Sequence, residues 1–325
     1  MKFSRRSILA GALAVPATAW AQTNSAWPSA LLMATGRPGG AYDVYGPAWG
    51  RLAEQFLAIS IAYRASGGAA SDILLIEQGA VQLGMTTVTV ADQARTGTGI
   101  WTAGVKFENF RALFPMFPSI LQIVSAQKTK IAAIRDLAGR TVGIGPDGGS
   151  GATSIQQIFA SVGVIPTRFV TGDFSSQVRD MQAGILDACA FISAPPTPAI
   201  ARAAQNANFN LIGFTPDETL QVLRAAPGMT PMPLPPGTFP GQSVAIASIG
   251  TPNFSIGAKS LPDPVVTALT LAAMRNRASL AQLIPAAATS PAPLLATPGH
   301  LTFHPAAALA LRTLGLTVPQ TLIES

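Results

Sequence analysis

The sequence predicts an α/β protein in which two similar lobes are joined by chain crossings. Short apolar runs of strand character alternate with segments of helical periodicity, which is typical of parallel sheets covered by helices. The pattern of glycine-rich turn, helix, strand and helix begins after residue 34 and again after residue 144. Between the two occurrences, the apolar run RALFPMFPSILQIVSA contains two prolines, and we interpret it as a crossing between the lobes. A chain of 325 residues is long enough for two such units.

The two glycine-rich turns are GRPGGAY, from Gly36 to Tyr42, and PDGGSGAT, from Pro146 to Thr153. Each turn follows an expected strand and precedes an expected helix, so it places backbone N–H groups at a helix N-terminus. Glycine permits close approach of the backbone, and the helix dipole favours negative charge there. We therefore expect each turn to be an anion cradle, with one ligand held from two sides. Turns also use glycine for steric reasons alone.

The first residues are typical of an export signal that is cleaved near Ala21 before Gln22. A charged start, MKFSRRS, precedes the apolar run from Ile8 to Val15, which is too short to span a bilayer as a retained anchor. The adjacent Arg5 and Arg6 favour the twin-arginine route, and an ordinary secretory signal is the alternative. We expect residues 1–21 to be the signal peptide and the mature chain to be soluble in the periplasm.

Composition argues against a nucleic-acid-binding or disordered chain. Hydrophobic residues make up 48% and charged residues 11% of the sequence. The net charge of +6 includes Lys2, Arg5 and Arg6, so the rest of the chain carries 6 − 3 = +3. The single cysteine, Cys189, lies in the apolar run LDACAFI, where we expect a buried, unreactive thiol.

Strands are expected at short apolar runs in both lobes. Their ranges are Trp27 to Thr35, Ile61 to Arg64, Val81 to Met85, Thr86 to Val90, Thr141 to Ile144, Arg168 to Val170, Ala188 to Ile192 and Ser248 to Ala258.

Helical spacing is found between these runs. The expected helices are Val44 to Ile59 with Trp49, Leu52, Ala53 and Phe56 on one face, Ser71 to Gln78 capped by Ser71 or Asp72, one starting near Ala91, a short turn from Ile134 to Leu137, Ser154 to Ser161, Ser175 to Ala183, Pro264 to Arg275, and one begun by Pro305. The proline-rich stretch from Ala194 to Gly250 predicts a long loop.

Several side chains near the turns can bind a carboxylate. Arg37 lies within the first turn and Arg64 lies just before the turn SGGAASD. A guanidinium matches a carboxylate in a bidentate way, and the alternative for each arginine is a solvated surface position. Hydroxyl donors are available from Tyr42, Ser66, Ser150 and Thr153, although turn and cap residues look the same in sequence.

Metal and enzyme chemistry are not expected. His300 and His304 flank a strand-like LTF segment, which would separate their rings by about 13 Å, too far for one ion. Ser150 lacks the nucleophile-elbow pattern, and only these two histidines could act as its base. We therefore predict no catalytic residues, no metal and no cofactor.

The chain resembles the TAXI family, the solute-binding proteins of one branch of TRAP transporters. The resemblance is carried, in order, by ATGRPGGAY, SGGAASDI, GPDGGSGAT, QAGILDACAF, PPTPAI, PPGTFPGQ, LPDPVVTALT and HPAAALALRTLG. These motifs span nearly the whole mature chain. This chain departs from the usual family residues at Ala41, Asp43, Ala69, Asp72, Thr87, Thr89 and Ala152, so the resemblance constrains the fold more than the ligand.

The resemblance implies a two-lobed periplasmic solute-binding fold, with a mostly parallel sheet flanked by helices in each lobe and two hinge crossings. Lobe one is expected at residues 27–117 and 248–325, and lobe two at residues 118–247. The implied function is capture of a small carboxylate, amino-acid-like or dicarboxylate, for delivery to TRAP membrane permease subunits. A periplasmic subunit that signals to a membrane kinase is the alternative. We expect a monomer that binds no nucleic acid. The candidate ligand contacts are Thr35, Arg37, Gly39, Gly40, Tyr42, Arg64, Ser66, Gly67, Thr87, Thr89, Gly148, Gly149, Ser150, Thr153 and Thr197.

Overall fold

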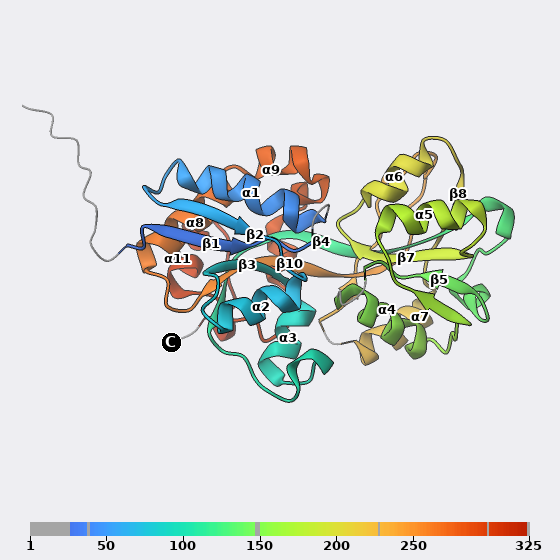
Figure 1. The fold of residues 1–325 in the computed structure, drawn as a ribbon, viewed down its shortest axis with the longest axis horizontal. Coiled ribbons are helices and arrows are strands. Elements are labelled where there is room, and N and C mark those ends of the chain that lie inside the picture. Colours follow the sequence, from blue (N-terminus) through green and yellow to red (C-terminus); the bar gives the residue numbers. More distant parts are fainter. Residues whose placement is uncertain (1–26, 38–39, 147–149, 227, 298, 324–325) are drawn as a thin grey trace, which may run out of the picture.

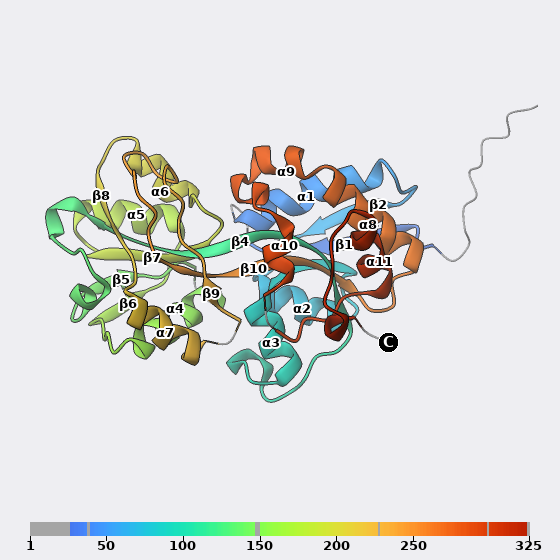
Figure 2. The same ribbon diagram turned by 180° about the vertical axis from the view of Figure 1, so that it is seen from behind.

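The computed structural model describes residues 27–37, 40–146, 150–226, 228–297 and 299–323. Two lobes lie side by side, joined by the long strands β4 (Phe110–Ala126) and β10 (Ile249–Ala258), which both run from one lobe into the other (Figures 1 and 2). The two-lobed α/β fold predicted from the sequence is confirmed. Of the 17 residues of β4, all are buried, because the strand passes through the middle of both lobes.

The hydrophobic core is divided between the lobes. One cluster of buried side chains draws almost entirely on residues 31–117 and 254–318. Two further clusters lie within residues 120–249. The lobe boundaries that we propose, 27–117 with 248–325 and 118–247, follow this division.

Parallel strands form the outer part of the sheet in each lobe. In lobe one, β1 (Ala30–Ala34) pairs in parallel with β2 (Ser60–Arg64) and β3 (Leu83–Thr87). In lobe two, β5 (Thr141–Gly143) pairs in parallel with β6 (Arg168–Val170) and β7 (Ala188–Ser193). The crossing strands β4 and β10 run antiparallel to each other and to their neighbours β7 and β3. The carboxyl ends of the parallel strands in both lobes therefore open toward the junction, where ligands bind in such sheets.

Helices cover both faces of each sheet. Figure 1 shows α1, α8 and α9 on one side of the lobe-one sheet and α2 and α3 on the other, and in lobe two α5 and α6 lie opposite α4 and α7. The helices of lobe one are α1 (Ala41–Glu54), α2 (Ala69–Glu77), α3 (Val88–Thr96), α8 (Asp263–Arg275), α9 (Arg277–Leu283), α10 (Pro291–Leu295) and α11 (Pro305–Thr313). Those of lobe two are α4 (Ser150–Ser161), α5 (Phe174–Ala183), α6 (Pro198–Ala204) and α7 (Pro216–Ala225).

Helix α1 is anchored by Trp49, which is fully buried. Its indole Nε1 donates to the Leu269 carbonyl of α8 at 3.1 Å, and its ring meets Phe114 edge-on at 5.0 Å. The helix was expected to continue to Ile59 with Phe56 on its buried face. It ends at Glu54 instead, and Phe56 is 58% exposed, because the chain turns after Ala53 and buries Leu57 in its place.

The proline-rich stretch from Ala194 to Gly250 is not a long loop. It contains α6, β8 (Phe209–Ile212), α7 and β9 (Thr230–Pro231). Pro198 and Pro216 stand at the first helical position, where a missing N–H costs nothing. Thr215 adds a capping box with Glu218.

Two expected boundaries at the cleft are also corrected. Val88 to Val90 are helical, although β-branched residues there predicted a strand, because Thr87 caps α3 by accepting from the Val90 amide at 3.2 Å. Helix α2 begins at Ala69 after Gly68, with no side-chain cap. Asp72 therefore lies inside the helix, where it is fully buried rather than acting as a cap.

Candidate functional site

A cavity of about 180 Å³ lies between the lobes, and we call it the interlobe cavity. Lobe one and the start of the crossing contribute Gly36, Arg37, Gly40, Ala41, Tyr42, Gly67, Gly68, Ala69, Thr87, Phe117, Ser119 and Asn253. Lobe two contributes Ile144, Pro146, Gly151, Ala152, Phe174, Ile192, Ser193 and Ala194. The described parts of the two glycine-rich turns thus line a single space.

Helix N-termini from both lobes converge on the interlobe cavity. Ala41 and Ala69 are the first residues of α1 and α2, and Thr87 is the N-cap of α3. From lobe two, Ala152 lies in the first turn of α4 and Phe174 begins α5. Each helix N-terminus carries a partial positive charge and N–H groups without intrahelical partners. The cavity is therefore an environment that favours an anion.

The first glycine-rich turn is tied to the turn that follows β2. Gly36, with φ of 69°, donates its N–H to Ser66 Oγ at 2.9 Å, and the Ser66 N–H donates to the Gly36 carbonyl at 2.9 Å. Gly40 donates to the Arg37 carbonyl at 3.0 Å, which closes the turn. The Arg37 side chain is exposed at the cavity. Some cradle amides therefore hold the loop, and Arg37 is a charged residue at the cavity wall.

Behind this wall lies a buried carboxyl group. Asp72 is 0% exposed, accepts from Ser66 Oγ, and accepts from the Met85 N–H at 3.0 Å. Burial raises the pKa of Asp72 from 3.8 to about 7, against the lowering effect of the Ser66 and Met85 hydrogen bonds. The group thus titrates in the neutral range.

A polar chain crosses the floor of the cavity. The Tyr42 hydroxyl donates to Asn253 Oδ1 at 2.7 Å, and Asn253 Nδ2 donates to the Phe117 carbonyl and to Ser119 Oγ, both at 2.9 Å. Burial, and then the negative charge of Asp72, raises the pKa of Tyr42 well above its usual value, so the phenol stays protonated. Sequence reasoning missed Asn253 and Ser119. The available signal was polar side chains within the buried crossing strands, which need hydrogen-bond partners.

The lobe-two wall is mainly apolar. Ile144, Phe174, Ile192 and Ser193 line the cavity, and Ser193 Oγ accepts from Gln122 Nε2 at 3.2 Å. The loop after β5 is held by Gln177, which is buried and accepts from the Gly145 N–H at 2.8 Å. Phe174 meets Phe191 edge-on at 4.7 Å, which fixes the ring at the cavity.

Of the candidate contacts, Arg37, Gly40, Tyr42, Gly67 and Thr87 line the interlobe cavity. Their contact with a ligand stays a prediction. Gly39, Gly148 and Gly149 lie outside the described residues, and of Ser150 only its place at the start of α4 is described.

The remaining candidates do not line the interlobe cavity. Thr35 is buried and donates to the Arg64 carbonyl, while the Arg64 side chain is exposed on β2. Thr89 is bound to Thr251 Oγ1 at 3.1 Å. Thr153 is exposed on α4. Residues next to them in the sequence line the cavity instead, as Gly36 does beside Thr35 and Ala152 beside Thr153.

Two further candidates support the wall from behind. Ser66 holds the Gly36 amide, and the Thr197 hydroxyl contacts that of Ser193, a residue that lines the interlobe cavity. Both residues adjoin the site in the sequence, but their side chains point into the structure behind the cavity wall.

The histidines and the cysteine are engaged elsewhere. His304 is buried and accepts from the Ala306 N–H at the start of α11, and His300 contacts Asp92. Burial raises the pKa of the Cys189 thiol to about 12, consistent with the expected unreactive side chain. Within the described ranges, no three His, Cys, Asp or Glu side chains are grouped to hold a metal ion.

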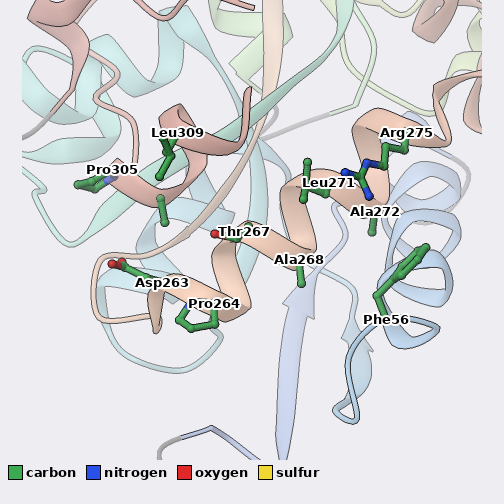
Figure 3. Close-up of a pocket in the computed structure, with 11 residues that line it drawn as sticks. Phe56, Asp263, Pro264, Thr267, Ala268, Leu271, Ala272, Arg275, Pro305 and Leu309 are labelled. Carbon is green, nitrogen blue, oxygen red and sulfur yellow. The ribbon is translucent and has the colours of Figure 1, made fainter. Parts of the chain in front are cut away.

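A larger hollow, of about 560 Å³, lies on the outer surface of lobe one. Figure 3 shows it between α8 and α11, with Phe56 at one end and Asp263 and Pro305 at the other. Phe56 and Leu309 leave 58% and 61% of their surface exposed. The hollow is mainly apolar and holds none of the predicted contacts, so we place the candidate site in the interlobe cavity.

Comparison with solved structures relates this fold to transport proteins. The chain is similar to a periplasmic transporter structure, with 15% identity, a TM-score of 0.53, and coverage of 79% of this chain and 87% of that one. It is also similar to a TctC solute-binding protein from Polaromonas, with 13% identity, a TM-score of 0.50, and 91% of each chain covered. A putative L-cystine ABC transporter protein from Listeria monocytogenes matches with 11% identity, a TM-score of 0.50, and 80% and 97% coverage.

The sequence itself matches the NMT1-like family over residues 33–315, which include both lobes and both crossing strands. This match covers most of the chain, and the two-lobed fold agrees with it. The chain belongs to the NMT1-like family, and it shares its fold with a periplasmic transporter structure and with a solute-binding protein.

Proposed function

We propose that this chain is a periplasmic receptor of a TRAP transporter, of the TAXI branch, that captures a small carboxylate in the interlobe cavity. Closure of the two lobes over the carboxylate prepares the receptor to deliver it to the membrane permease subunits. The motifs from ATGRPGGAY to HPAAALALRTLG support this assignment. No described helix is long and apolar enough to cross a membrane.

The observation that carries the proposal is the convergence of helix N-termini on the interlobe cavity. Helices α1, α2 and α3 approach from one lobe, and α4 and α5 approach from the other. An anion between them interacts with positive helix ends of both lobes at once and so stabilises the closed arrangement. This is the expected behaviour of a receptor that signals occupancy by closure.

The side chains that line the cavity support a carboxylate with an apolar portion. Arg37 provides a charged fork, and none of the described lining residues is acidic. Phe174 and Ile192 offer apolar contact on the opposite wall. A ligand with a cationic group and no carboxylate would meet the same positive helix ends with no acidic side chain at the described wall, so we exclude such amines from the proposed class.

A thermal-shift screen tests the proposal. The carboxylate panel is L-glutamate, glutarate, 2-oxoglutarate and benzoate, and glucose and putrescine serve as neutral and cationic controls. Binding to the folded state adds RT ln(1 + [L]/Kd), about 2.7 kcal/mol at a hundredfold excess over Kd. We expect at least one panel carboxylate to raise the melting temperature clearly. Stabilisation by glucose or putrescine alone would contradict the proposed ligand class.

Export is tested separately with the full-length precursor. Replacing both Arg5 and Arg6 by lysine should leave unprocessed precursor in the cytoplasm, because the twin-arginine signal is recognised as an address. The measurement is fractionation followed by immunoblotting, with the native precursor as control. Export at the native rate would leave ordinary secretion as the route.

A further inference from the structure

Asp72 is a fully buried acid directly behind the anion-favouring wall of the interlobe cavity. Its two hydrogen-bond partners are Ser66 Oγ and the Met85 N–H. No lysine, arginine or histidine in the described part of the chain forms an ion pair with it. A buried carboxylate without a cation is unfavourable unless it is protonated.

Asp72 is paired with no cationic side chain in the described part of the chain; the nearby positive groups are the α2 N-terminus, with a partial charge, and Arg37 at the cavity wall. Helix α2 packs against β3, β10, β4 and α3, and neither β3 nor β10 carries a titratable side chain. The titratable groups on the other packed elements are Glu77 of α2 itself, Asp92 and Arg95 of α3, and Arg111 of β4, and Tyr42 at the start of α1 is close enough to feel the charge of Asp72. Arg95 and Arg111 donate to backbone carbonyls of residues 108 and 110, Asp92 contacts His300, and Glu77 accepts from Asn109. Burial, and then the negative charge of Asp72, raise the pKa of Tyr42, which stays neutral.

One hydroxyl group separates this acid from the cavity. Ser66 Oγ contacts Asp72 Oδ1 and also accepts from the amides of Gly36, at 2.9 Å, and Gly68, at 3.3 Å. Gly36 and Gly68 both line the interlobe cavity. An anion at this wall therefore lies close to the carboxyl group, in a region where the low dielectric strengthens repulsion between like charges.

From this geometry we propose that Asp72 is a positioning residue that couples binding of a carboxylate in the interlobe cavity to uptake of one proton. In the free protein above neutral pH, Asp72 is ionised and Ser66 donates to it. When the anion binds, the carboxyl group takes up a proton from solvent and becomes neutral, while Ser66 Oγ, whose lone pairs accept from the Gly36 and Gly68 amides, keeps donating to Asp72 Oδ1. The same loop amides stay bound to Ser66, and the like-charge repulsion is removed. The inference rests on the proposed function.

The coupling operates near neutral pH because burial raises the pKa of Asp72 to about 7 in the free protein. A nearby bound anion raises this pKa further, since it disfavours a second negative charge. By linkage, the anion then binds more tightly at lower pH. The panel carboxylates themselves stay ionised above pH 6.5, because the carboxyl pKa of a model acid is about 4.

The test measures binding of the panel carboxylates by calorimetry at pH 6.5 and pH 8.5. For the panel member that gives the largest thermal shift, we expect Kd to be about five- to twentyfold lower at pH 6.5 than at pH 8.5, with about 0.3 to 0.8 of a proton taken up on binding at pH 8. Proton uptake is read from the heat measured in two buffers of different ionisation enthalpy. Asp72→Asn keeps the size and the hydrogen-bonding capacity of the side chain, and it should bind at both pH values with an affinity close to that of the native protein at pH 6.5.

The outcomes separate the inference from the proposed function. Equal Kd at both pH values with no proton uptake, or tighter binding at pH 8.5, would overturn the coupling while carboxylate binding stands. If none of the panel carboxylates binds at either pH, both the proposed function and the coupling fall. A ligand-free measurement decides independently: ¹³C NMR of the Asp72 carboxyl, assigned by its loss in Asp72→Asn, should titrate near pH 7. A midpoint near 4 would also overturn the inference.

Discussion

The two lobes hold their cleft loops in the same way but with different chemistry. In lobe one, Gly36 follows β1 with φ of 69°, and its amide is held by Ser66, which is backed by the acid Asp72. In lobe two, Gly145 follows β5 with φ of 81°, and its amide is held at 2.8 Å by Gln177. Gln177 also donates to the Val170 carbonyl at 2.8 Å, so its amide is satisfied at both ends.

This difference shows that a buried side chain that holds a cleft loop, which we call its anchor, need not be titratable. A glutamine satisfies the lobe-two loop at any pH, whereas the lobe-one loop depends on a carboxyl group whose charge changes near neutrality. The cavity walls differ in the same sense, since lobe one presents Arg37 and Tyr42 while lobe two presents Phe174 and Ile192. In the proposed receptor, lobe one therefore supplies the interactions that depend on charge, and lobe two supplies apolar contact with the ligand.

The largest expected effect is on stability at Asp72. Because the folded pKa is raised from 3.8 to about 7, stability is present at low pH and is lost as the pH rises through this window. Asn cannot ionise, so Asp72→Asn should be more stable than the native chain at pH 8. Urea unfolding should show this advantage widening by about 2–3 kcal/mol between pH 5 and pH 8.

The reverse substitution in lobe two tests the same difference between the lobes. Gln177→Glu places an acid at the buried lobe-two anchor, so its stability relative to the native chain should fall as the pH rises. An advantage of Asp72→Asn that stays constant with pH would show that the two anchors do not differ in titration.

Removal of the neutral anchor should be costly at every pH. Gln177→Leu leaves the Gly145 N–H and the Val170 carbonyl without their partner and should lower the free energy of unfolding by about 2 kcal/mol. Chemical denaturation at pH 5 and pH 8 measures it, with the conservative Gln177→Met as a volume control. Destabilisation confined to high pH would contradict the assignment of lobe two as the insensitive side.

The charged wall should dominate ligand affinity. Arg37→Ala removes the guanidinium from the interlobe cavity and should weaken carboxylate binding by about tenfold to a hundredfold, with partial rescue by Arg37→Lys. Arg64→Ala is the matched control, because Arg64 is exposed on β2 and does not line this cavity. Calorimetry compares the two variants. Similar affinities for Arg37→Ala and the native chain would place Arg37 in solvent.

The apolar wall should contribute least. Phe174→Ala removes ring contact from the lobe-two side and should weaken binding by about threefold to tenfold, with no change in its dependence on ligand charge. Phe174→Leu retains most of the packing on Phe191 and controls for loss of stability. A larger effect than that of Arg37→Ala would reverse the assignment of the two walls.

Local patterns in the sequence determined much of the fold. The alternation of strands and helices, the proline-containing crossing later found as β4, and the return strand β10 all follow from short-range periodicity. The glycine-rich turns could be located because glycine is needed where φ is positive, as at Gly36 and Gly145. Errors arose where prolines begin helices, at Pro198 and Pro216, and where a cap overrode strand propensity, at Thr87.

The composition of the site was decided only by tertiary structure. Sequence reasoning reached the turns, but it could not tell that Ser66 points inward to the Gly36 amide, or that Asn253 arrives from a strand more than 200 residues after Tyr42. It read Asp72 as a helix cap because a polar residue near a turn is ordinarily exposed. Burial and long-range hydrogen bonds are properties of the assembled sheet, since they depend on which strands and helices pack around each side chain, and they turn this aspartate into a titratable group at the cleft.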